Sequence, residues 1–590
     1  MIQNADAYFM CGFVCVTVYA QIFSLFAGVG LVANGILCAV CAVIAWVDRK
    51  ALSETVRRLA LAGGETARTG KARESSLFLV LFLFFAYGAS RGMIHYDTGL
   101  YHAQSIRWIE EYGVVKGLGN LHCRLAYNSS SFALSALYSM AFLGGQSYHC
   151  AAGWLAFLLA LVCLPIGKAL RTGRLRTSGF ARVMCVYYLV NIFDEMISPA
   201  SDYFMVLVAF YIVIKWLDLV ESGEETVLPY ALLCVLGVFL MTVKLSAALI
   251  LLLTVYPACR LLREKRWKET GVYLGLGLLT AVPFFARNVV ISGWLVYPFT
   301  QLDLFHVVWK IPKGLADYDA REIQVWGRGY TDVTQFDMPV REWLPGWFRT
   351  LAGSDKLLVT VAAAAVVLFF LEAVYLAWRW VRERRAAAVG RAVPLRVHGT
   401  AVPDDSASQD RVRFPALLTV QATVSASFVF WLCTSPLVRY GCVWVYLTSA
   451  VVFGGIYDTA MHSGAAGERM TADSRMRDER VSGIKSRRVA GALRWRPAAG
   501  WIVSAAVILL LAYKGFALAR ETAGSYVNDY WIVQKDYENY ETYAYRIEGA
   551  PFYCPVEGDR VGYAAFPSSP SEAHISFLGE GIAEGFRAAE

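Results

Sequence analysis

The chain consists of long apolar runs separated by short charged or glycine-rich segments. A helix that crosses the hydrocarbon core of a bilayer needs about 20 predominantly apolar residues, so each long run is a candidate span. The candidate spans lie at residues 8–26, 29–47, 76–93, 149–168, 182–199, 203–219, 228–244, 246–262, 271–286, 356–380, 414–433, 441–458 and 498–517. A weaker run, 130–145, is expected to be a short or re-entrant segment. The pattern predicts an all-α polytopic membrane protein of about 13 spans.

Composition agrees with this interpretation. The 590 residues are 57% hydrophobic and 17% charged, which excludes an ordinary soluble protein. The net charge of +8 does not indicate a nucleic-acid partner, because the basic residues lie in particular loops rather than on one domain. The 13 cysteines mostly fall inside apolar runs, where free cysteine behaves as a small hydrophobe. The first run has no basic region before it, so it is expected to remain as an anchor.

The basic residues also predict the orientation of the chain. The segment 48–75 is rich in Arg and Lys, which places it and the N-terminus in the cytoplasm. Residues 94–131 and 287–355 then become outer loops, and the basic loop 168–182 is cytoplasmic. A complete crossing by 130–145 is the alternative, and it would reverse the side of loop 168–182.

The expected division of the chain follows from these assignments. It comprises two N-terminal spans with a cytoplasmic loop (1–75), a transmembrane module (76–458), a basic cytoplasmic linker (459–497), a last span (498–517) and an outer C-terminal tail (518–590). The linker and the similar segment 386–413 have little apolar periodicity and are predicted to be flexible. Gly and Pro spacing in the tail predicts short strands and turns.

The outer loop 94–131 is the first long polar interruption after the early spans. Within it, the stretch TGLYHAQSIRWIEEY places Leu100, Ala103, Ile106 and Ile109 at helical spacing. That spacing predicts an amphipathic helix on the membrane surface.

Five ionisable residues are expected on the outer side, near the membrane boundary: Asp97, His102, Asp202, Lys244 and Arg439. Ionisable groups near lipid are costly and usually face a cavity. A carboxylate there can act as a general base or hold a divalent metal, and a cation can bind phosphate.

Each of these residues also has a structural interpretation. Asp97 and Asp202 both come just before a predicted helix, where an Asp often caps the helix N-terminus. Lys244 and Arg439 lie in apolar surroundings, where a long basic side chain can extend to the interface without binding anything. The histidines show no HExxH-like spacing, so the sequence gives a metal site only weak support.

The order of these elements resembles a known family over roughly residues 76–445. The similarity consists of an acid after an early span (Asp97), the surface helix ending IRWIEEYG, and the segments NSSSFALSAL, SPASDYFMVLVAFYIVIKW, TVKLSAAL, PFFARNVV and SPLVRYG. This layout resembles the integral-membrane C-type glycosyltransferases (GT-C superfamily), in particular bacterial members of unassigned specificity. The resemblance implies a GT-C-like helical bundle within residues 76–458.

The resemblance also implies roles for individual residues. Asp97 takes the catalytic position and Asp202 the second acidic position. Apart from the resemblance, His102 is expected to contact substrate as one of the five outer ionisable residues. Lys244, Arg287 and Arg439 are candidate ligands of the donor phosphate. The commoner family pattern has two nearby acids in the first outer loop, whereas Asp97 in this chain is flanked by Tyr96 and Thr98, so a divalent metal cofactor is left open.

The expected function is transfer of a sugar from a polyprenyl-phosphate-linked donor on the outer face of the cytoplasmic (inner) membrane. The acceptor is a glycan, a lipid or a protein, and the setting is assembly of cell-surface glycans. Two alternatives remain open: a transporter or flippase of lipid-linked glycans, and a polysaccharide polymerase or ligase. Transporters often contain inverted repeats, and no such repeat stands out in this sequence.

Overall fold

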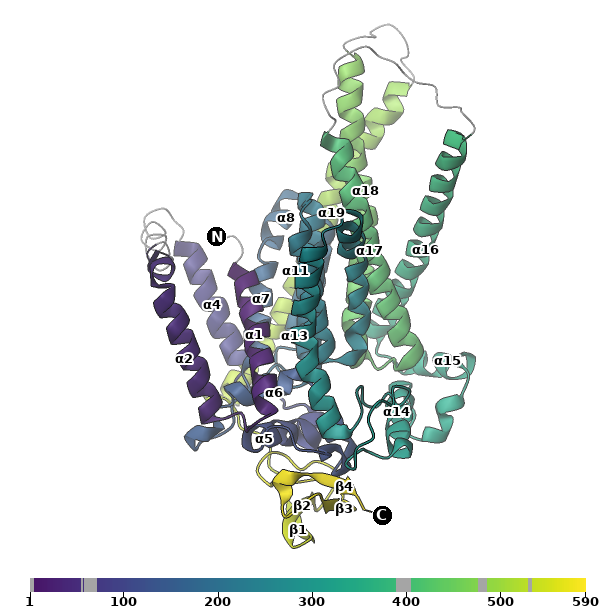
Figure 1. The fold of residues 1–590 in the computed structure, drawn as a ribbon. Helices are drawn as coiled ribbons and strands as arrows, with labels where there is room; N and C mark the ends of the chain where they lie inside the picture. Colours follow the sequence, from purple (N-terminus) through teal and green to yellow (C-terminus); the bar gives the residue numbers. More distant parts are fainter. Residues whose placement is uncertain are drawn as a thin grey trace.

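The computed structural model describes residues 5–54, 57, 72–388, 405–475, 485–528 and 533–589. Most of the described residues are helical (Figure 1). The α-helices are α1 (Ala5–Ser24), α2 (Leu31–Val47), α4 (Ala72–Gly88), α5 (Ala103–Glu111), α6 (Ser130–Tyr138), α7 (Ala151–Cys163), α8 (Ile166–Thr172), α9 (Thr177–Asn191), α10 (Ser201–Ser222), α11 (Val227–Val243), α12 (Val255–Arg263), α13 (Trp267–Ser292), α14 (Lys313–Gly327), α15 (Val340–Thr350), α16 (Gly353–Ala388), α17 (Asp405–Thr434), α18 (Val438–Arg475) and α19 (Lys485–Asn528).

Shorter helical turns and four strands complete the described chain. The turns are η2 (Thr98–His102), η3 (Leu118–Asn120), η4 (Cys123–Ala126), η5 (Ala141–Leu143), η6 (Leu245–Thr254), η7 (Val333–Asp337) and η8 (Ile582–Glu584). The strands β1 (Thr542–Ile547) and β2 (Ala550–Pro555) form one antiparallel pair, and β3 (Ile575–Phe577) and β4 (Phe586–Ala588) form another. Strands in the C-terminal tail were expected from its Gly and Pro spacing, and this prediction is confirmed.

Nine helical segments among the described residues are long and apolar enough to cross a membrane, which agrees with an all-α membrane protein. They are Ala5–Ser24, Ala151–Thr172, Ser201–Ser222, Leu245–Arg263, Trp267–Ser292, Gly353–Tyr375, Phe414–Thr434, Val438–Met461 and Ala498–Val527. Three other predicted spans correspond to the shorter apolar helices α2, α4 and α11, and a fourth, 182–199, corresponds to α9. The total of 13 full spans stays a prediction.

The two ends of the bundle differ in character. One end, which we call the basic end, contains the basic loops 168–182 and 260–269. There Arg176 lies 3.8 Å from Glu221 and 3.6 Å from Asp458, and Arg260 donates a hydrogen bond to the carbonyl of Glu225. At the other end, which we call the strand end, the loop 94–131, the helices α14 and α15 and the four strands gather beneath the bundle (Figure 1). The loops that the charge pattern assigned to one side of the membrane therefore share one end of the molecule.

The stretch 130–145 forms a short apolar helical segment. Helix α6 has nine residues and is about 13 Å long, far less than the thickness of a bilayer core. Ser129, before α6, donates a hydrogen bond to the carbonyl of Val243 (2.8 Å), and Ser139, after it, accepts one from Tyr148 N (2.8 Å). The chain therefore lies at the strand end again before α7 begins, where Ser147 bonds to Glu110 of α5.

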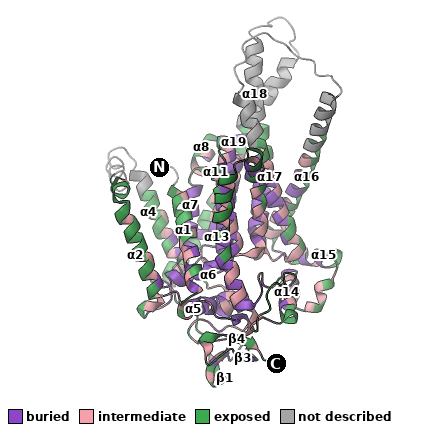
Figure 2. Ribbon diagram, viewed as in Figure 1, coloured by how far each residue is buried: buried purple, intermediate pink, exposed green. Residues whose placement is uncertain are grey.

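Helix α10 forms the centre of the bundle, and it packs against α7, α9, α11, α17 and α18. Nearly all of its side chains are buried, including aromatic residues such as Phe204, Phe210 and Trp216. By contrast, α2 exposes apolar side chains along most of its length (Figure 2), among them Ile44 and Val47. Exposed apolar surface on an outer helix fits contact with lipid, so the bundle has an inner helix and lipid-facing outer ones.

The basic segments differ from the sequence-based prediction. Helix α17 begins at Asp405, α18 continues to Arg475 and α19 begins at Lys485, so much of the predicted flexible linkers is helical. These stretches extend helices that are already formed, so they avoid the cost of nucleation, and they are rich in Ala and Arg, which favour helix. Residues 389–404 and 476–484 of the predicted linkers lie outside the described residues.

The C-terminal strands pack on the amphipathic helix of the first loop. Helix α5 forms where the sequence predicted it, and Trp108 on it stacks edge-on against Phe586 of β4, with ring centroids 5.9 Å apart. Gln104 Nε2 donates hydrogen bonds to the carbonyls of Gly562 (2.9 Å) and Ala565 (2.8 Å). The strand domain (residues 533–589) therefore holds the loop 94–131 in place.

Candidate functional site

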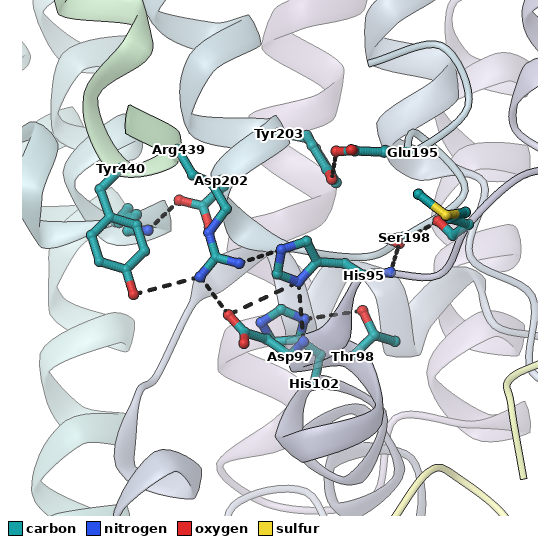
Figure 3. Close-up of polar contacts among 12 residues, drawn as sticks. His95, Asp97, Thr98, His102, Glu195, Ser198, Asp202, Tyr203, Arg439 and Tyr440 are labelled. Atoms are coloured by element: carbon teal, nitrogen blue, oxygen red, sulfur yellow. Dashed lines mark hydrogen bonds and ion pairs between the residues drawn. The ribbon is translucent and has the colours of Figure 1, made fainter. Parts of the chain in front are cut away.

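A cluster of charged side chains lies where four segments end at the strand end of the bundle (Figure 3). Asp97 comes from the loop after α4, Asp202 from the first turn of α10, Lys244 from the junction of α11 and η6, and Arg439 from the first turn of α18. The sequence predicted all four as candidate site residues, and the structure brings them together.

The backbone around Asp97 is fixed by contacts with the segment before α10. His95 N donates a hydrogen bond to Ser198 Oγ (2.6 Å), and Met93 N donates one to the carbonyl of Asp194 (2.9 Å). Asp97 directly precedes η2, but its side chain accepts no capping hydrogen bond from that turn. The helix-cap interpretation therefore does not account for the carboxylate of Asp97.

Arg439 connects the two carboxylates. Its Nη2 donates to Asp97 Oδ2 at 2.8 Å, and its Nε lies 3.6 Å from Asp202 Oδ2. Its Nη1 contacts Nε2 of His95. A planar guanidinium can bridge acids in this way because it presents five donors in a fixed geometry. Asp202 is also not a helix cap, since the capping position of α10 is Ala200.

Lys244 is held on the other side of Asp202. The chain is extended at Lys244 (φ −152°, ψ 120°), because α11 ends at Val243 and η6 begins at Leu245. Its Nζ forms an ion pair with Asp202 Oδ1 and lies 4.3 Å from the ring centre of Tyr440. Lys244 therefore points into the cluster rather than along the bundle surface to water.

The cluster is close to electrically neutral and open to solvent. Two carboxylates face two cations, and burial together with the nearby Arg439 lowers the pKa of His95, so that this imidazole stays uncharged at neutral pH. The side chains of Arg439, Lys244 and Asp97 are 29%, 22% and 20% exposed, and that of Asp202 is 8% exposed. A ligand can therefore reach Asp97 and the two cations, whereas Asp202 lies behind them.

Two other predicted substrate ligands lie outside this cluster. His102 is 1% exposed, and its Nδ1 shares a hydrogen bond with Thr98 Oγ1 (3.2 Å). Burial lowers the pKa of His102 to about 3, so it carries no charge for a phosphate. Arg287 is also 1% exposed, and its hydrogen bonds go to Asn128 Oδ1 (3.0 Å) and Ser24 Oγ. Direct substrate contact by these two residues has no support in their geometry.

The residues present do not fit a carboxylate-held divalent metal. No group of three or more His, Cys, Asp or Glu side chains within the described ranges could hold an ion. The carboxylate oxygens of Asp97 and Asp202 that would serve as ligands face Arg439 and Lys244 instead.

Sequence reasoning did not include three residues of the cluster among the site residues. His95 contacts Arg439, Ser198 anchors the backbone of His95, and the ring of Tyr440 lies beneath both Lys244 and Arg439. The available signals were positional, because His95 stands two residues before Asp97 and Tyr440 directly follows Arg439. Ser198 carried no signal beyond its place before Pro199.

Comparison with known proteins gives a family but no activity. Neither the curated proteins nor the solved structures contain a match to this chain. The family described as "Domain of unknown function (DUF8201)" matches residues 2–446, a range that includes the four charged residues of the cluster. That range is well over half of the chain, and the protein therefore belongs to the DUF8201 family.

Proposed function

We propose that the protein is a membrane glycosyltransferase that moves a sugar from a polyprenyl-phosphate-linked donor to an acceptor hydroxyl. The reaction takes place at the outer face of the cytoplasmic membrane, in the assembly of cell-surface glycans. The observation that carries the proposal is the bridge from Arg439 to both Asp97 and Asp202, which joins a solvent-reachable acid to fixed cations at the ends of apolar helices.

The position of the cluster suits a lipid-linked donor. All four charged residues lie at helix termini on one end of the bundle, where a polyprenyl phosphate places its charged group while its chain stays among apolar helices. A transporter site is expected nearer the middle of the bilayer, between broken helices. The placement therefore favours group transfer at the membrane boundary over transport.

In the proposed reaction, Asp97 acts as the general base. The acceptor hydroxyl gives its proton to the Asp97 carboxylate as its oxygen forms a bond to the anomeric carbon of the sugar. The bond from that carbon to the phosphate oxygen breaks, and its electron pair leaves with the polyprenyl phosphate. No oxidant or further reactant is needed, and proton transfer of this kind contributes on the order of 10²–10⁴-fold to a rate.

The cations stabilise the departing phosphate. Arg439 has donors beyond its contact with Asp97, and Lys244 brings an amino group on a side chain that is 22% exposed. Asp202, which is buried behind them, fixes the positions of both. Asp202 is therefore a positioning residue in this mechanism, rather than the second catalytic acid that the family resemblance implies.

The test is release of polyprenyl phosphate by the purified full-length protein in lipid nanodiscs, with a panel of synthetic polyprenyl-phosphate sugars. We expect Asp97→Asn to reduce release about 10²–10⁴-fold, because an amide cannot accept the proton. Asp218→Asn is the matched control. Asp218 also pairs with an arginine (Arg182, 2.7 Å), but it lies near the C-terminus of α10, at the basic end of the bundle. Equal release by the two folded variants would remove Asp97 from the mechanism.

A further inference from the structure

The strand domain contains a cavity of about 360 Å³. Cavities of roughly 300–1,000 Å³ are typical of sites for small molecules. The side chains that define its chemistry are Asn539, Tyr540, Thr542, Tyr553 and Phe566. They come from the approach to β1, from β1 and β2, and from the loop that covers α5.

Several polar groups of this cavity are free to bind a ligand. Within the described chain, the side chains of Asn539, Thr542 and Tyr553 form no hydrogen bond with other protein groups. Together they offer an amide and two hydroxyls, each able to donate and to accept. The rings of Tyr540, Tyr553 and Phe566 supply apolar surface beside these groups.

The lining indicates a neutral ligand with many hydroxyl groups. No charged side chain lines the cavity itself. The nearest are Arg107, over the ring of Phe566, and Arg560, over the ring of Tyr540, and these two arginines pair with Glu111 and Glu538. The lining therefore gives a phosphate, a carboxylate or an ammonium group no direct partner of opposite charge. A sugar ring has an apolar face that packs on an aromatic ring, and its hydroxyls both donate and accept hydrogen bonds. Aromatic rings next to an amide and hydroxyls match that chemistry.

The cavity is joined to the segment that carries Asp97. Its wall residue Tyr540 lies against Gly99, where a Cβ atom would be 2.8 Å from the tyrosine oxygen. The carbonyl of Gly99 accepts hydrogen bonds from the backbone N–H groups of Val561 (2.9 Å) and Gly562 (2.8 Å). Gly99 stands two residues after Asp97, so the cavity wall contacts the same backbone segment that carries the proposed base.

The surface between them is also suited to a sugar chain. Tyr96, directly before Asp97, is half exposed and hydrogen-bonds to Asp559 through its hydroxyl. The guanidinium of Arg560 lies 5.0 Å from the ring of Tyr96 and 4.7 Å from the ring of Tyr540. Aromatic rings and polar groups therefore continue from the cavity to the residue next to the base.

We propose that this cavity binds a neutral sugar unit of the acceptor, which makes the acceptor a glycan rather than a lipid or a protein. The role as acceptor site rests on the proposed function, whereas sugar binding itself does not. The strand domain then holds the growing glycan while its reactive hydroxyl lies at Asp97.

The first experiment measures binding without donor. Purified full-length protein in nanodiscs is applied to an array of neutral and acidic oligosaccharides from bacterial envelopes, together with a set of peptides. We expect neutral oligosaccharides to bind. Asn539→Ala and Tyr553→Phe should each weaken binding about three- to tenfold, because each removes hydrogen bonds to a neutral ligand. Tyr543→Phe is the matched control, since Tyr543 lies on β1 outside the cavity and bonds to Glu572.

The second experiment separates this inference from the proposed function. Asp97→Asn should keep wild-type affinity for the oligosaccharide and lose release of polyprenyl phosphate. Two results would overturn the sugar site while the proposed transferase activity stands. In the first, wild type releases polyprenyl phosphate but binds no oligosaccharide. In the second, wild type releases polyprenyl phosphate and both cavity variants still bind oligosaccharide. Binding of peptides alone overturns the sugar site as well. Oligosaccharide binding that the cavity variants lose, without turnover of any donor, keeps the sugar site and refutes its role for an acceptor.

Discussion

Two arginines near the strand end of the bundle, Arg439 and Arg287, look alike in the sequence but occupy opposite environments. Arg439 is 29% exposed at its side chain and contacts two carboxylates, a histidine and a tyrosine ring. Arg287 is 1% exposed and bonds to Ser24 and Asn128, and no ion pair to it occurs among the described residues.

This difference indicates which arginine could bind a phosphate in place of its present partners. A phosphate can replace or share the contacts of Arg439, because these contacts are charged and reach solvent. Arg287 instead connects α13 to α1 and to the end of the first loop, through neutral partners that a ligand cannot reach. A cation near the membrane boundary is a candidate phosphate ligand only if a ligand can reach it.

The largest effect is expected from Asp202→Asn, which removes the carboxylate between Lys244 and Arg439. Loss of one partner from a buried ion pair costs about 3–5 kcal/mol. We expect the lower end of that range, because Arg439 keeps Asp97 and the side chain of Lys244 is 22% exposed. At the other arginine, Ser24→Ala removes one hydrogen bond to a charged group and should cost about 1.5–3 kcal/mol. Reversible unfolding in mixed detergent micelles measures both. Equal costs would mean that Asp202 does not compensate the two cations.

The next effect is on donor affinity, which we expect to depend on Arg439 and Lys244 but not on Arg287. Arg439→Gln and Lys244→Met should each weaken donor binding by about 1.5–3 kcal/mol, and so raise the donor KM roughly 10- to 150-fold. The acceptor KM should stay nearly unchanged. Steady-state kinetics with varied donor is the measurement.

Arg287→Gln is the counterpart, and its donor KM should stay within twofold of wild type in folded protein. A tenfold rise in that variant would return Arg287 to the donor site that the family resemblance gave it. It would also show that exposure of an arginine side chain does not determine whether it binds the donor.

Per pH unit, the smallest effect is that of pH on stability. Burial lowers the pKa of His102 to about 3 and that of His122 to about 4, from an ordinary value of 6.5. The unfolded chain therefore binds protons more readily, so stability is kept above pH 6.5 and falls as the pH decreases from 6.5 towards 4. Each such histidine contributes up to about 1.4 kcal/mol per pH unit.

Melting temperatures between pH 8 and pH 4 test this expectation, and His102→Gln should make the decrease shallower. The same slope in wild type and in the folded variant would show that His102 takes up no proton on unfolding. The ring of His102 lies 6.3 Å from that of His95, so this variant reports proton uptake next to the Arg439 cluster.

Much of the fold could be predicted from the length of the apolar runs and from the basic loops. A span must exceed a minimum length, and the Arg-rich loops predict which end of each span is cytoplasmic. These assignments were enough to predict Asp97, Asp202, Lys244 and Arg439 at one end. It could not predict which of them pair, since Arg439 meets Asp97 across 342 residues of sequence. The enclosure of Arg287 also had no sequence signal, because burial depends on how the loop folds over α13 and α1.

The hydrogen bonds that hold the first loop also set an order of assembly during synthesis. Gln104 bonds to the carbonyl of Ala565, which follows it by 461 residues. At about 5–20 residues per second, the ribosome needs roughly half a minute to a minute and a half to make that stretch. Until residue 565 has been made and has reached the strand end, the helix beside Asp97 lacks these contacts. A chain that is cut short before the strand domain therefore leaves the loop 94–131 without this support.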